Sequence, residues 1–580
     1  MSSEGFEPLT LRLERFARDF PHATAVLSES GDWTYERLVT EMCSVGAALE
    51  REDPRGLRAI LVAAPGPLFL SGFLGCLAVG AIPVPLPWPT GPAARKWERF
   101  LALARNARPS FLIGEPSQLI QAAPKLGEIA DDRGERPRMV SLPTVASMGP
   151  LRHRPDPAEV AFLQYTSGST QEPRGVVISH EALYFMLERI REIVAVDQVN
   201  PNRPPFTTVT WLPPHHDMGL VGMLLAPMHL GAPVRILDPR RFLEDPLDWL
   251  ESLALESESV GAAPNFALAL VAERAQGVDL GHLDLSRCRR LVCGAEPVHA
   301  STIDSFLETV APCGFRPEAL TPSYGLAEAT LVVTRSVGPR VLECDGRALG
   351  RGEIVPGSGR RIVSSGSPIE GVEIMIIDPE TGIGVPDGRL GEVCVGGPGL
   401  ASGYWRRPEE TARVFGTRCG KEGKPLARTG DLGALFHGEL YVADRLKDLV
   451  VIRGAKYHPV DIEEATTSSH EAVVTAVAFA VQREGLERLV LMIERRVGEV
   501  PDADLESRIR GAVLDAHGLS VFGLALLRRG QLPRTTSGKV QRARCREMFE
   551  AGKWAPGLID PGAVATASPE GARPENWRNE

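Results

Sequence analysis

The sequence has 580 residues, which is enough for several domains and a large hydrophobic core. Hydrophobic residues make up 43% and charged residues 24% of it, the balance of an ordinary globular protein. The formal net charge of −10 argues against a nucleic-acid partner, because such partners demand a basic face. The nine cysteines are scattered without CxxC pairs, which argues against a zinc site and favours reduced thiols in a cytoplasmic compartment.

One stretch has the length of a membrane span. Residues 68–86 are almost uncharged. They follow a strand-like run at 59–64 and are interrupted by Gly80, Pro83 and Pro85. We therefore interpret the region as strand, buried helix and strand, and not as part of a membrane transporter. The first ten residues lack a basic start followed by an apolar run, so we expect no signal peptide.

Short apolar runs alternate with helical patterns along most of the chain, which predicts α/β layers. A helix is expected at 181–194, with Ser179 as its N-cap. From about residue 444 the pattern predicts a smaller unit of strands and helices. Residues 556–580 are rich in Pro, Gly, Ala and charge, and we expect a disordered tail there.

A polar loop lies between the strand-like runs VAFLQY and GVVIS. It consists of Thr166, Ser167, Gly168, Ser169 and Thr170. Small hydroxyl residues and glycine allow N–H and O–H groups to converge on phosphate oxygens. The loop is not a Walker loop, because GxxxxGK[ST] is absent and a strand follows. Taken alone, such a loop is more often a polar turn than a nucleotide site.

Further polar blocks follow in chain order: WLPPHHDMG at 211–219, CGAEP at 293–297, SYGLAE at 323–328, TGDLG at 429–433, DRLKD at 444–448 and LPRTTSGK at 532–539. Each has an ordinary structural explanation. Adjacent histidines with divergent rings can line a pocket, a tyrosine can belong to the core, and a carboxylate can begin a helix or form a surface ion pair. We expect the chain after Tyr324 to turn into a helix.

In this order and spacing, the motifs resemble those of the acyl-adenylate-forming superfamily, which includes acyl-CoA synthetases, peptide-synthetase adenylation domains and luciferases. The resemblance extends from about residue 8 to residue 550. The loop resembles YTSG[ST]TGxPKG, with Gln171 in place of glycine and Arg174 in place of lysine. Arginine keeps the charge and can fork onto phosphate. The resemblance implies a large domain of mixed sheets and helices at 1–443, and a small mobile α+β domain at 444–555 with a hinge at Lys447.

The resemblance also implies ATP and Mg²⁺ as cofactors. The nucleotide-binding residues that it implies are Thr166, Ser167, Gly168, Ser169, Thr170, Arg174, Gly294, Ala295, Glu296, Ser323, Tyr324, Gly325, Asp431 and Arg445. Among them, Tyr324 is expected to stack on adenine and Asp431 to bind the ribose hydroxyls.

The same resemblance supplies the metal and catalytic residues. Glu328 and Thr166 are the expected metal ligands, and Glu328 is also counted as catalytic. His216 is expected near the reacting carboxylate. Lys539 is expected to bridge that carboxylate and the α-phosphate as charge develops.

HHDMGL, CGAEPV and SYGLAEATL resemble the fatty acyl-AMP ligase branch, and residues 337–361 resemble its characteristic insertion. A tolerated surface loop is the alternative explanation for that insertion. We expect the segment to be anchored on the large domain by its apolar residues Val341, Leu342, Leu349, Ile354 and Val355.

This branch implies activation of a fatty acid to acyl-AMP, followed by transfer to the phosphopantetheine thiol of a partner supplied in trans. That partner is an acyl carrier protein or a carrier domain of a polyketide or peptide synthase. A fatty acyl-CoA ligase is the first alternative. A non-catalytic adenylate-binding regulator is the second, and it is disfavoured because Glu328, Asp431, Arg445 and Lys539 are all intact.

Overall fold

The computed structural model describes residues 5–50, 53–89, 94–127, 129–144, 153–166, 173–196, 199–202, 204–419, 423–452, 455–483, 486–496, 501–534, 538 and 540–552. The chain divides into two compact units, residues 1–443 and residues 444–580. The tail expected at 556–580 lies outside the described residues.

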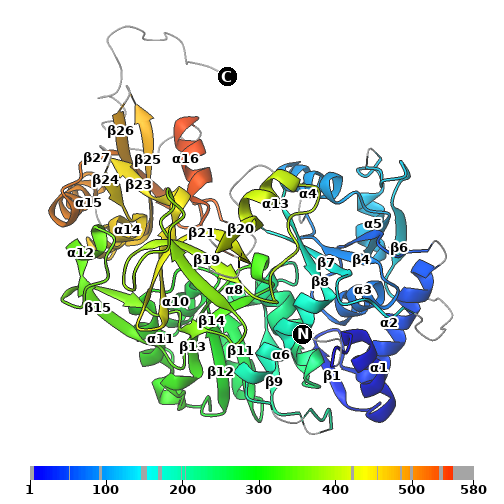
Figure 1. The fold of residues 1–580 in the computed structure, drawn as a ribbon. Helices are drawn as coiled ribbons and strands as arrows, with labels where there is room; N and C mark the ends of the chain where they lie inside the picture. The colour runs from blue at the N-terminus through cyan, green and yellow to red at the C-terminus, as the bar shows by residue number, and fades with distance from the viewer. Residues whose placement is uncertain are drawn as a thin grey trace, which may run out of the picture. The chain divides into compact units, whose positions relative to one another are not determined.

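A nine-stranded sheet forms the centre of the first unit (Figure 1), in the order β17-β14-β13-β12-β11-β9-β10-β1-β2. The strands are β1 (Thr24–Ser28), β2 (Trp33–Thr34), β9 (Thr207–Thr210), β10 (Val234–Ile236), β11 (Ser259–Ala263), β12 (Cys288–Cys293), β13 (Leu320–Gly325), β14 (Val332–Arg335) and β17 (Ser367–Pro368). From β13 to β1 all neighbours are parallel, while β2, β14 and β17 pair antiparallel at the ends. Cys293 pairs with Pro322, so β12 ends beside Pro322, and β13 continues to Gly325.

A second, four-stranded parallel sheet has the order β4-β3-β5-β6. Its strands are β3 (Arg58–Leu61), β4 (Ile82–Pro85), β5 (Phe111–Gly114) and β6 (Arg138–Ser141). Helix α3 (Pro67–Ala78) connects β3 to β4 and is almost entirely buried. The interpretation of 68–86 as helix and strand is therefore confirmed. Within the described part of the chain, no helix combines the length and the apolar character that crossing a membrane requires.

The strands expected around the polar loop are β7 (Val160–Tyr165) and β8 (Gly175–Ser179), which pair as an antiparallel hairpin. Helix α6 (His180–Ile193) follows β8 directly. The Ser179 side chain accepts a hydrogen bond from the Ala182 N–H at 3.1 Å. The expected helix and its N-cap are confirmed, with the boundaries shifted by one residue.

A five-stranded sheet is formed by β18 (Glu373–Ile377), β19 (Gly391–Gly396), β20 (Thr417–Cys419), β21 (Lys424–Phe436) and β22 (Glu439–Arg445), whose last two residues lie beyond the boundary of the first unit. Further α-helices of the first unit are α1 (Leu9–Asp19), α2 (Tyr35–Leu49), α4 (Ala94–Ala107), α5 (Pro116–Ala122), α7 (Ala226–His229), α8 (Pro239–Glu244), α9 (Leu247–Ala254), α10 (Asn265–Arg274), α11 (Ala300–Val310) and α13 (Pro408–Phe415). A π-helix, η2 (Met218–Leu225), leads into α7, and the first unit has 3₁₀ turns at η3 (Ala311–Cys313), η4 (Pro317–Ala319) and η5 (Ala327–Ala329). The turn η6 (Leu446–Asp448) belongs to the second unit.

Residues 337–361 form structure of their own, with β15 (Val341–Asp345), α12 (Gly346–Gly350) and the first part of β16 (Gly359–Val363). Leu349 and Ile354 are buried against Ala434 and Tyr441 of β21 and β22. The segment is thus anchored on the first unit, as expected. Val355, however, is 43% exposed and does not anchor it.

The second unit is built on a three-stranded sheet of β25 (Val473–Arg483), β26 (Leu486–Arg495) and β27 (Val521–Arg528). Its helices are α14 (Pro459–Ser468), α15 (Asp502–His517) and α16 (Arg542–Glu550), and a small hairpin pairs β23 (Val450–Ile452) with β24 (Ala455–Tyr457). Ile462, Leu505 and Ile509 bury the helices α14 and α15 against the sheet.

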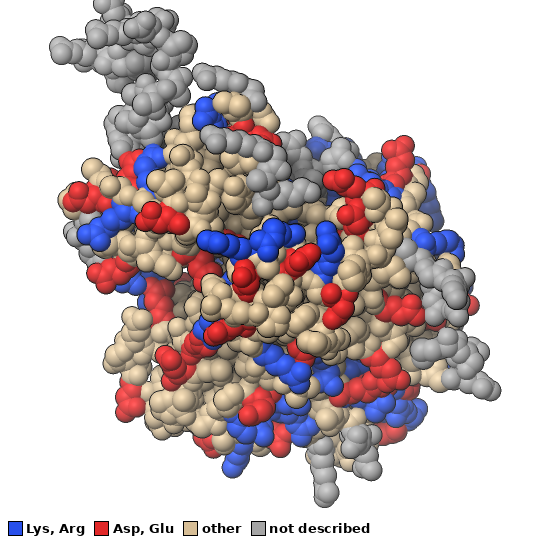
Figure 2. All heavy atoms as spheres, turned by 60° about the vertical axis from the view of Figure 1, so that its left-hand side comes forward, with Lys and Arg blue, Asp and Glu red and all other residues tan. Residues whose placement is uncertain are grey.

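Basic and acidic side chains are interspersed over the face drawn in Figure 2. The cysteines whose side chains are described are all free and buried. Burial raises the pKa of several of these thiols, and that of Cys43 rises to about 11. Their thiols are therefore protonated packing groups and not reactive thiolates.

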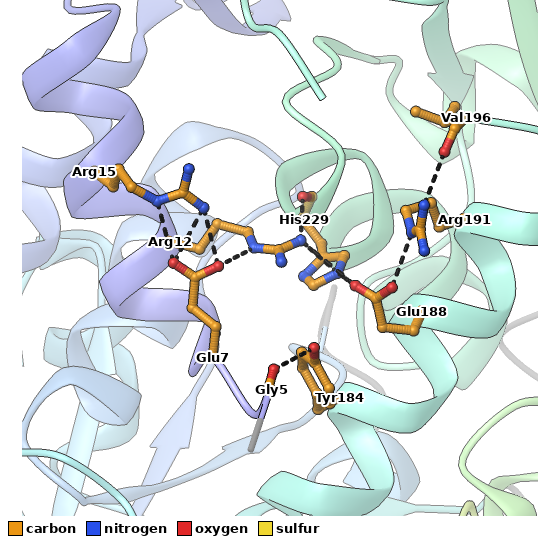
Figure 3. A network of polar contacts seen from close by, with 9 residues as sticks. All are labelled: Gly5, Glu7, Arg12, Arg15, Tyr184, Glu188, Arg191, Val196 and His229. Atoms are coloured by element: carbon orange, nitrogen blue, oxygen red, sulfur yellow. Dashed lines mark hydrogen bonds and ion pairs between the residues drawn. The ribbon is translucent and has the colours of Figure 1, made fainter. Parts of the chain in front are cut away.

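A buried polar network fastens the N-terminal helix to the centre of the first unit (Figure 3). Arg12 of α1 pairs with Glu7 at 2.7 Å, and its Nη1 lies 2.7 Å from Nε2 of His229. The same ring nitrogen lies 2.6 Å from Oε1 of Glu188 on α6. The hydrogen bond with His229 is the largest influence that holds the pKa of Glu188 at about 2. Glu188 therefore stays ionised at neutral pH, whereas burial lowers the pKa of His229.

We predict that Arg12→Met lowers the free energy of unfolding by about 2 kcal/mol, because Arg12 is the cation that Glu7 and Glu188 share. Glu7 still pairs with Arg15 and Glu188 with Arg191, but both of these arginines are more exposed than Arg12. Urea denaturation measures the shift as a lower midpoint of the first transition. Arg18→Met is the matched control on the same helix: Arg18 pairs only with its neighbour Asp19 at the surface, and we expect less than about 0.5 kcal/mol. Equal midpoints for the two variants would contradict a stabilising role of the network.

Candidate functional site

The loop after β12 touches the last part of β13. The two strands are neighbouring and parallel, so this loop and the residues beyond β13 lie at the same edge of the sheet. A Cβ atom on Gly294 would lie 2.5 Å from the backbone oxygen of Ser323, and one on Gly325 would lie 1.9 Å from the backbone oxygen of Leu331. Glycine is therefore required at both positions, and the structure brings the motifs 293–297 and 323–328 together.

Tyr324 and Asp431 are joined by a hydrogen bond although they are far apart in sequence. The Tyr324 hydroxyl donates to Oδ2 of the buried Asp431 at 2.7 Å. The Asp431 N–H donates in turn to the Thr429 hydroxyl, which donates to the carbonyl of Val393 on β19. The residues expected at the base and at the ribose of a nucleotide are thus neighbours in the fold.

The helix expected after Tyr324 is not formed, and that expectation is wrong. Glu328 lies instead in η5, a single 3₁₀ turn. Thr330 then has a left-handed backbone with φ +67°, which reverses the chain into the antiparallel strand β14. Helix-dipole stabilisation therefore does not account for a carboxylate at this position.

The Glu328 carboxylate is held by a residue from a distant segment. The hydroxyl of Tyr404 donates to its Oε1 at 2.6 Å. Burial raises the pKa of Tyr404, so this hydroxyl stays protonated and remains a donor. The backbone holds the same contact, because the Ala401 N–H donates to the Glu328 carbonyl at 2.9 Å.

The ends of the polar loop are also fixed. The Thr166 N–H donates to the carbonyl of Arg174 at 3.2 Å and closes the β7–β8 hairpin. The guanidinium of Arg174 pairs with Glu410 of α13 at 2.9 Å and lies 5.8 Å from the centre of the Tyr404 ring. Ser167, Gly168, Ser169 and Thr170 lie outside the described residues.

In the CGAEP motif, Glu296 has a structural hydrogen-bond partner and Ala295 has a strained backbone. Glu296 accepts a hydrogen bond from the Phe266 N–H at 2.7 Å and so holds the first turn of α10. Ala295 has a left-handed φ of +67° and is exposed. A nucleotide contact by Ala295 or Glu296 stays a prediction.

The histidine pair is arranged differently from our expectation. The rings of His215 and His216 are not divergent: their centroids lie 4.6 Å apart with the planes tilted by 45°. The reason is that the pair lies in a turn before η2 and not on a regular strand or helix. Burial, followed by the charge of Arg99, lowers the pKa of His215 to about 4, so His215 is neutral at physiological pH.

A metal site built from protein side chains alone is not found in the part of the chain that is described, because no group of three or more His, Cys, Asp or Glu side chains is suitably placed there. The donor set of Thr166 and Glu328, a hydroxyl and a carboxylate, still fits a hard cation. Mg²⁺ commonly takes one or two protein oxygens, and substrate phosphates and water supply the rest.

The remaining expected residues belong to the smaller unit or adjoin it. Arg445 ends β22 and is exposed. Lys539 lies outside the described residues. Their roles stay predictions.

Sequence reasoning missed Tyr404 and Glu410. Both lie in the segment GYWRRPEE at 403–410, whose aromatic pair between glycine and arginines is a weak signal at best. Only the fold shows that Tyr404 bridges antiparallel to Val176 of β8 and so reaches Glu328.

Comparison with known families gives two matches that together span most of the chain. The family described as AMP-binding enzyme matches residues 13–405. The AMP domain of the Disco-interacting protein 2-like type matches residues 447–555.

Among curated relatives, the medium-chain-fatty-acid–[acyl-carrier-protein] ligase JamA of Moorena producens is 34% identical over 544 residues, covering 90% of this chain and 91% of the relative. The long-chain-fatty-acid–AMP ligase FadD23 of Mycobacterium tuberculosis is 33% identical, covering 92% of each chain. A putative fatty-acid–CoA ligase of the same organism, FadD21, is 34% identical and covers 92% of this chain and 94% of the relative.

Solved structures give the same result. The fatty acid AMP ligase of Legionella pneumophila is 30% identical, with a TM-score of 0.69 over 94% of this chain and 96% of that one. The fatty acyl-adenylate ligase of L. pneumophila in complex with acyl adenylate and pyrophosphate is 31% identical, with the same TM-score and coverage. The adenylate-forming fold expected from the sequence is confirmed, and the chain belongs to the AMP-binding enzyme family.

Proposed function

We propose that this enzyme activates a fatty acid with Mg·ATP. In the proposed reaction a carboxylate oxygen of the fatty acid attacks the α-phosphorus of ATP. The bond from that phosphorus to the bridging oxygen breaks, and acyl-AMP and pyrophosphate are formed. The relatives named as fatty acyl-AMP ligases support this reaction.

One observation carries the proposal, the hydrogen bond from Tyr324 to Asp431. It places an aromatic ring, which can stack on a purine, beside a carboxylate, which can accept hydrogen bonds from a vicinal diol. The close contact between Gly294 and Ser323 adds a loop edge formed by backbone alone, which a flat base can approach closely.

Mg²⁺ fits the same site. Glu328 and Thr166 would hold it, and the bound ion would offset charge on the phosphates. Arg174 is proposed to contact a phosphate, although its guanidinium pairs with Glu410 in the structure. Lys539 is proposed to approach from the smaller unit and to bridge the carboxylate and the α-phosphate.

We further propose that the acyl group passes to the phosphopantetheine thiol of an acyl carrier protein supplied in trans. The name of the relative from Moorena producens supports this acceptor. A fatty acyl-CoA ligase is the second candidate, and the name of the mycobacterial relative FadD21 favours it. The free cysteines of the described chain are compatible with the cytoplasmic location that we propose.

We predict that Gly294→Ala weakens binding of a non-hydrolysable ATP analogue about tenfold or more. The new Cβ would force the chain at position 294 away from the backbone of Ser323 in β13, and overpacking of this kind costs about 1–3 kcal/mol. Calorimetric titration measures the affinity. Gly350→Ala is the matched control, since nothing lies within 4 Å of a Cβ at that position. Unchanged affinity in Gly294→Ala would remove this loop edge from the nucleotide site.

Mass spectrometry of the products tests the function itself. With ATP, a fatty-acid mixture and either free CoA or a phosphopantetheinylated carrier protein, we expect acyl-AMP in both reactions, acyl-carrier protein in the second, and little acyl-CoA in the first. Efficient acyl-CoA synthesis would favour the second candidate function.

We predict that Lys539→Ala binds ATP normally but releases pyrophosphate about 10²–10³ times more slowly, because the lysine acts when charge develops. A variant that keeps more than half the parental rate of pyrophosphate release would exclude Lys539 from catalysis.

The segment at 337–361 separates the two candidates. We propose that, while anchored, it disfavours the reorientation of the smaller unit that transfer to CoA requires. Shortening it to a tight turn should then raise acyl-CoA formation and spare adenylation. Even a few kcal/mol would change the populations of the two arrangements by large factors.

A pair of adjacent substitutions refines this test. Ile354→Asp should release the segment, because Ile354 is 5% exposed and a buried carboxylate is costly. Val355→Asp should not, because Val355 is 43% exposed. Acyl-AMP formation is assayed in the same samples to show that the site is intact. Equal acyl-CoA yields from both variants and the parent would contradict a role of the segment in acceptor choice.

A further inference from the structure

The segment from Gly399 to Trp405 connects two parts of the proposed site. On one side it pairs with β8: the Val177 N–H donates to the Gly403 carbonyl at 2.9 Å, and the Trp405 N–H donates to the Gly175 carbonyl at 2.7 Å. On the other side it holds the turn at Glu328, because the Thr330 hydroxyl donates to the Gly399 carbonyl at 2.8 Å. The strand that follows the polar loop and the turn that carries Glu328 are therefore held by one short stretch of backbone.

Tyr404 is the side chain at the middle of this connection. It is only 6% exposed. Its hydroxyl donates to Glu328, and its ring lies beneath the guanidinium of Arg174. Its own N–H donates to the Thr411 hydroxyl at 2.9 Å, which ties the residue to α13. One rigid aromatic residue thus contacts both the expected metal-binding carboxylate and the expected phosphate-binding cation.

We propose that Tyr404 is a positioning residue for the metal site: its hydroxyl sets the orientation in which Glu328 presents its carboxylate to Mg²⁺. This inference rests on the proposed role of Glu328 as a metal ligand. A carboxylate has about four acceptor positions on its two oxygens, so one hydrogen bond fixes its rotation without using up its capacity for a metal. The Glu328 carboxylate needs its negative charge to bind a cation. A neutral phenol leaves that charge in place, whereas a lysine or arginine partner would offset it.

The structure also explains why the hydroxyl can be tested separately from the ring. Tyr404→Phe keeps the aromatic face below Arg174 and the backbone bonds to β8, and it removes only the hydrogen bond to Glu328. Tyr184→Phe is the matched control. The Tyr184 hydroxyl likewise donates a 2.6 Å hydrogen bond, to the carbonyl of Gly5, at a position outside the proposed site.

The experiment measures metal binding directly and not through turnover. Mn²⁺ is titrated into the enzyme saturated with a non-hydrolysable ATP analogue, and free Mn²⁺ is followed by electron paramagnetic resonance. We expect about tenfold weaker Mn²⁺ binding in Tyr404→Phe, as for loss of one hydrogen bond to a charged group. Affinity for the metal-free analogue and the KM for fatty acid should be unchanged, and Tyr184→Phe should match the parent.

A double-mutant cycle assigns the effect to Glu328. Glu328→Gln should weaken Mn²⁺ binding, and adding Tyr404→Phe to it should produce little further loss, because the two residues act as a unit. If Glu328→Gln binds Mn²⁺ like the parent, the proposed metal role of Glu328 is wrong. If Glu328→Gln is impaired but Tyr404→Phe is not, or if the two losses are additive, only the positioning role is overturned.

A second measurement keeps the hydroxyl in place in case the phenylalanine variant does not fold. With 3-fluorotyrosine incorporated at position 404, the ¹⁹F resonance should shift when Mg²⁺ is added to the complex with the ATP analogue. The same label at position 184 should not respond. An unchanged resonance at 404 would overturn the positioning role.

Discussion

The parallel pairing of β11, β12 and β13 is the constraint on which the proposed site depends. Ala263 pairs with Cys293, and Cys293 pairs with Pro322, so β11 and β12 end at the same level, beside Pro322 of β13. Their loops must then emerge at one edge of the sheet. Glycine at 294 and 325 lets the chain pass so closely that no side chain can intervene. The strand register therefore brings motifs that are distant in sequence together on one surface.

Acidic groups of the site are held by neutral donors. Tyr324 holds Asp431 and Tyr404 holds Glu328, in each case through a phenolic hydroxyl at 2.7 Å or less. A phenol fixes the direction of a carboxylate and leaves its negative charge available to a diol or a cation. The arginine at the end of the polar loop, in contrast, has a charged partner, because Arg174 forms an ion pair with Glu410. In these two contacts a neutral donor orients a carboxylate, whereas in the third an acidic partner offsets the charge of Arg174.

The parts around the site are fastened by a different kind of contact. The N-terminal helix is attached through the polar network of Arg12, Glu188 and His229, which is largely buried and therefore costly to break (Figure 3). Residues 337–361 are attached through apolar contacts of Leu349 and Ile354 with β21 and β22. The first attachment joins elements of the core, whereas the second holds a hairpin on the outside of a sheet.

The sequence by itself determined the elements whose signal is local. Helix α6 with its Ser179 cap, the strand–helix–strand at 58–85 and the hairpin around the polar loop follow from hydrophobic period and capping chemistry. The order of the motifs gave the family and most of the expected nucleotide-binding residues. Tertiary structure alone decided the turn at Glu328, the contact between His215 and His216, and the partners Tyr404 and Glu410. The physical reason for the histidine contact is an irregular turn without a periodic pattern, and the partners Tyr404 and Glu410 depend on contacts between residues up to 236 positions apart (174 to 410), which no local pattern encodes.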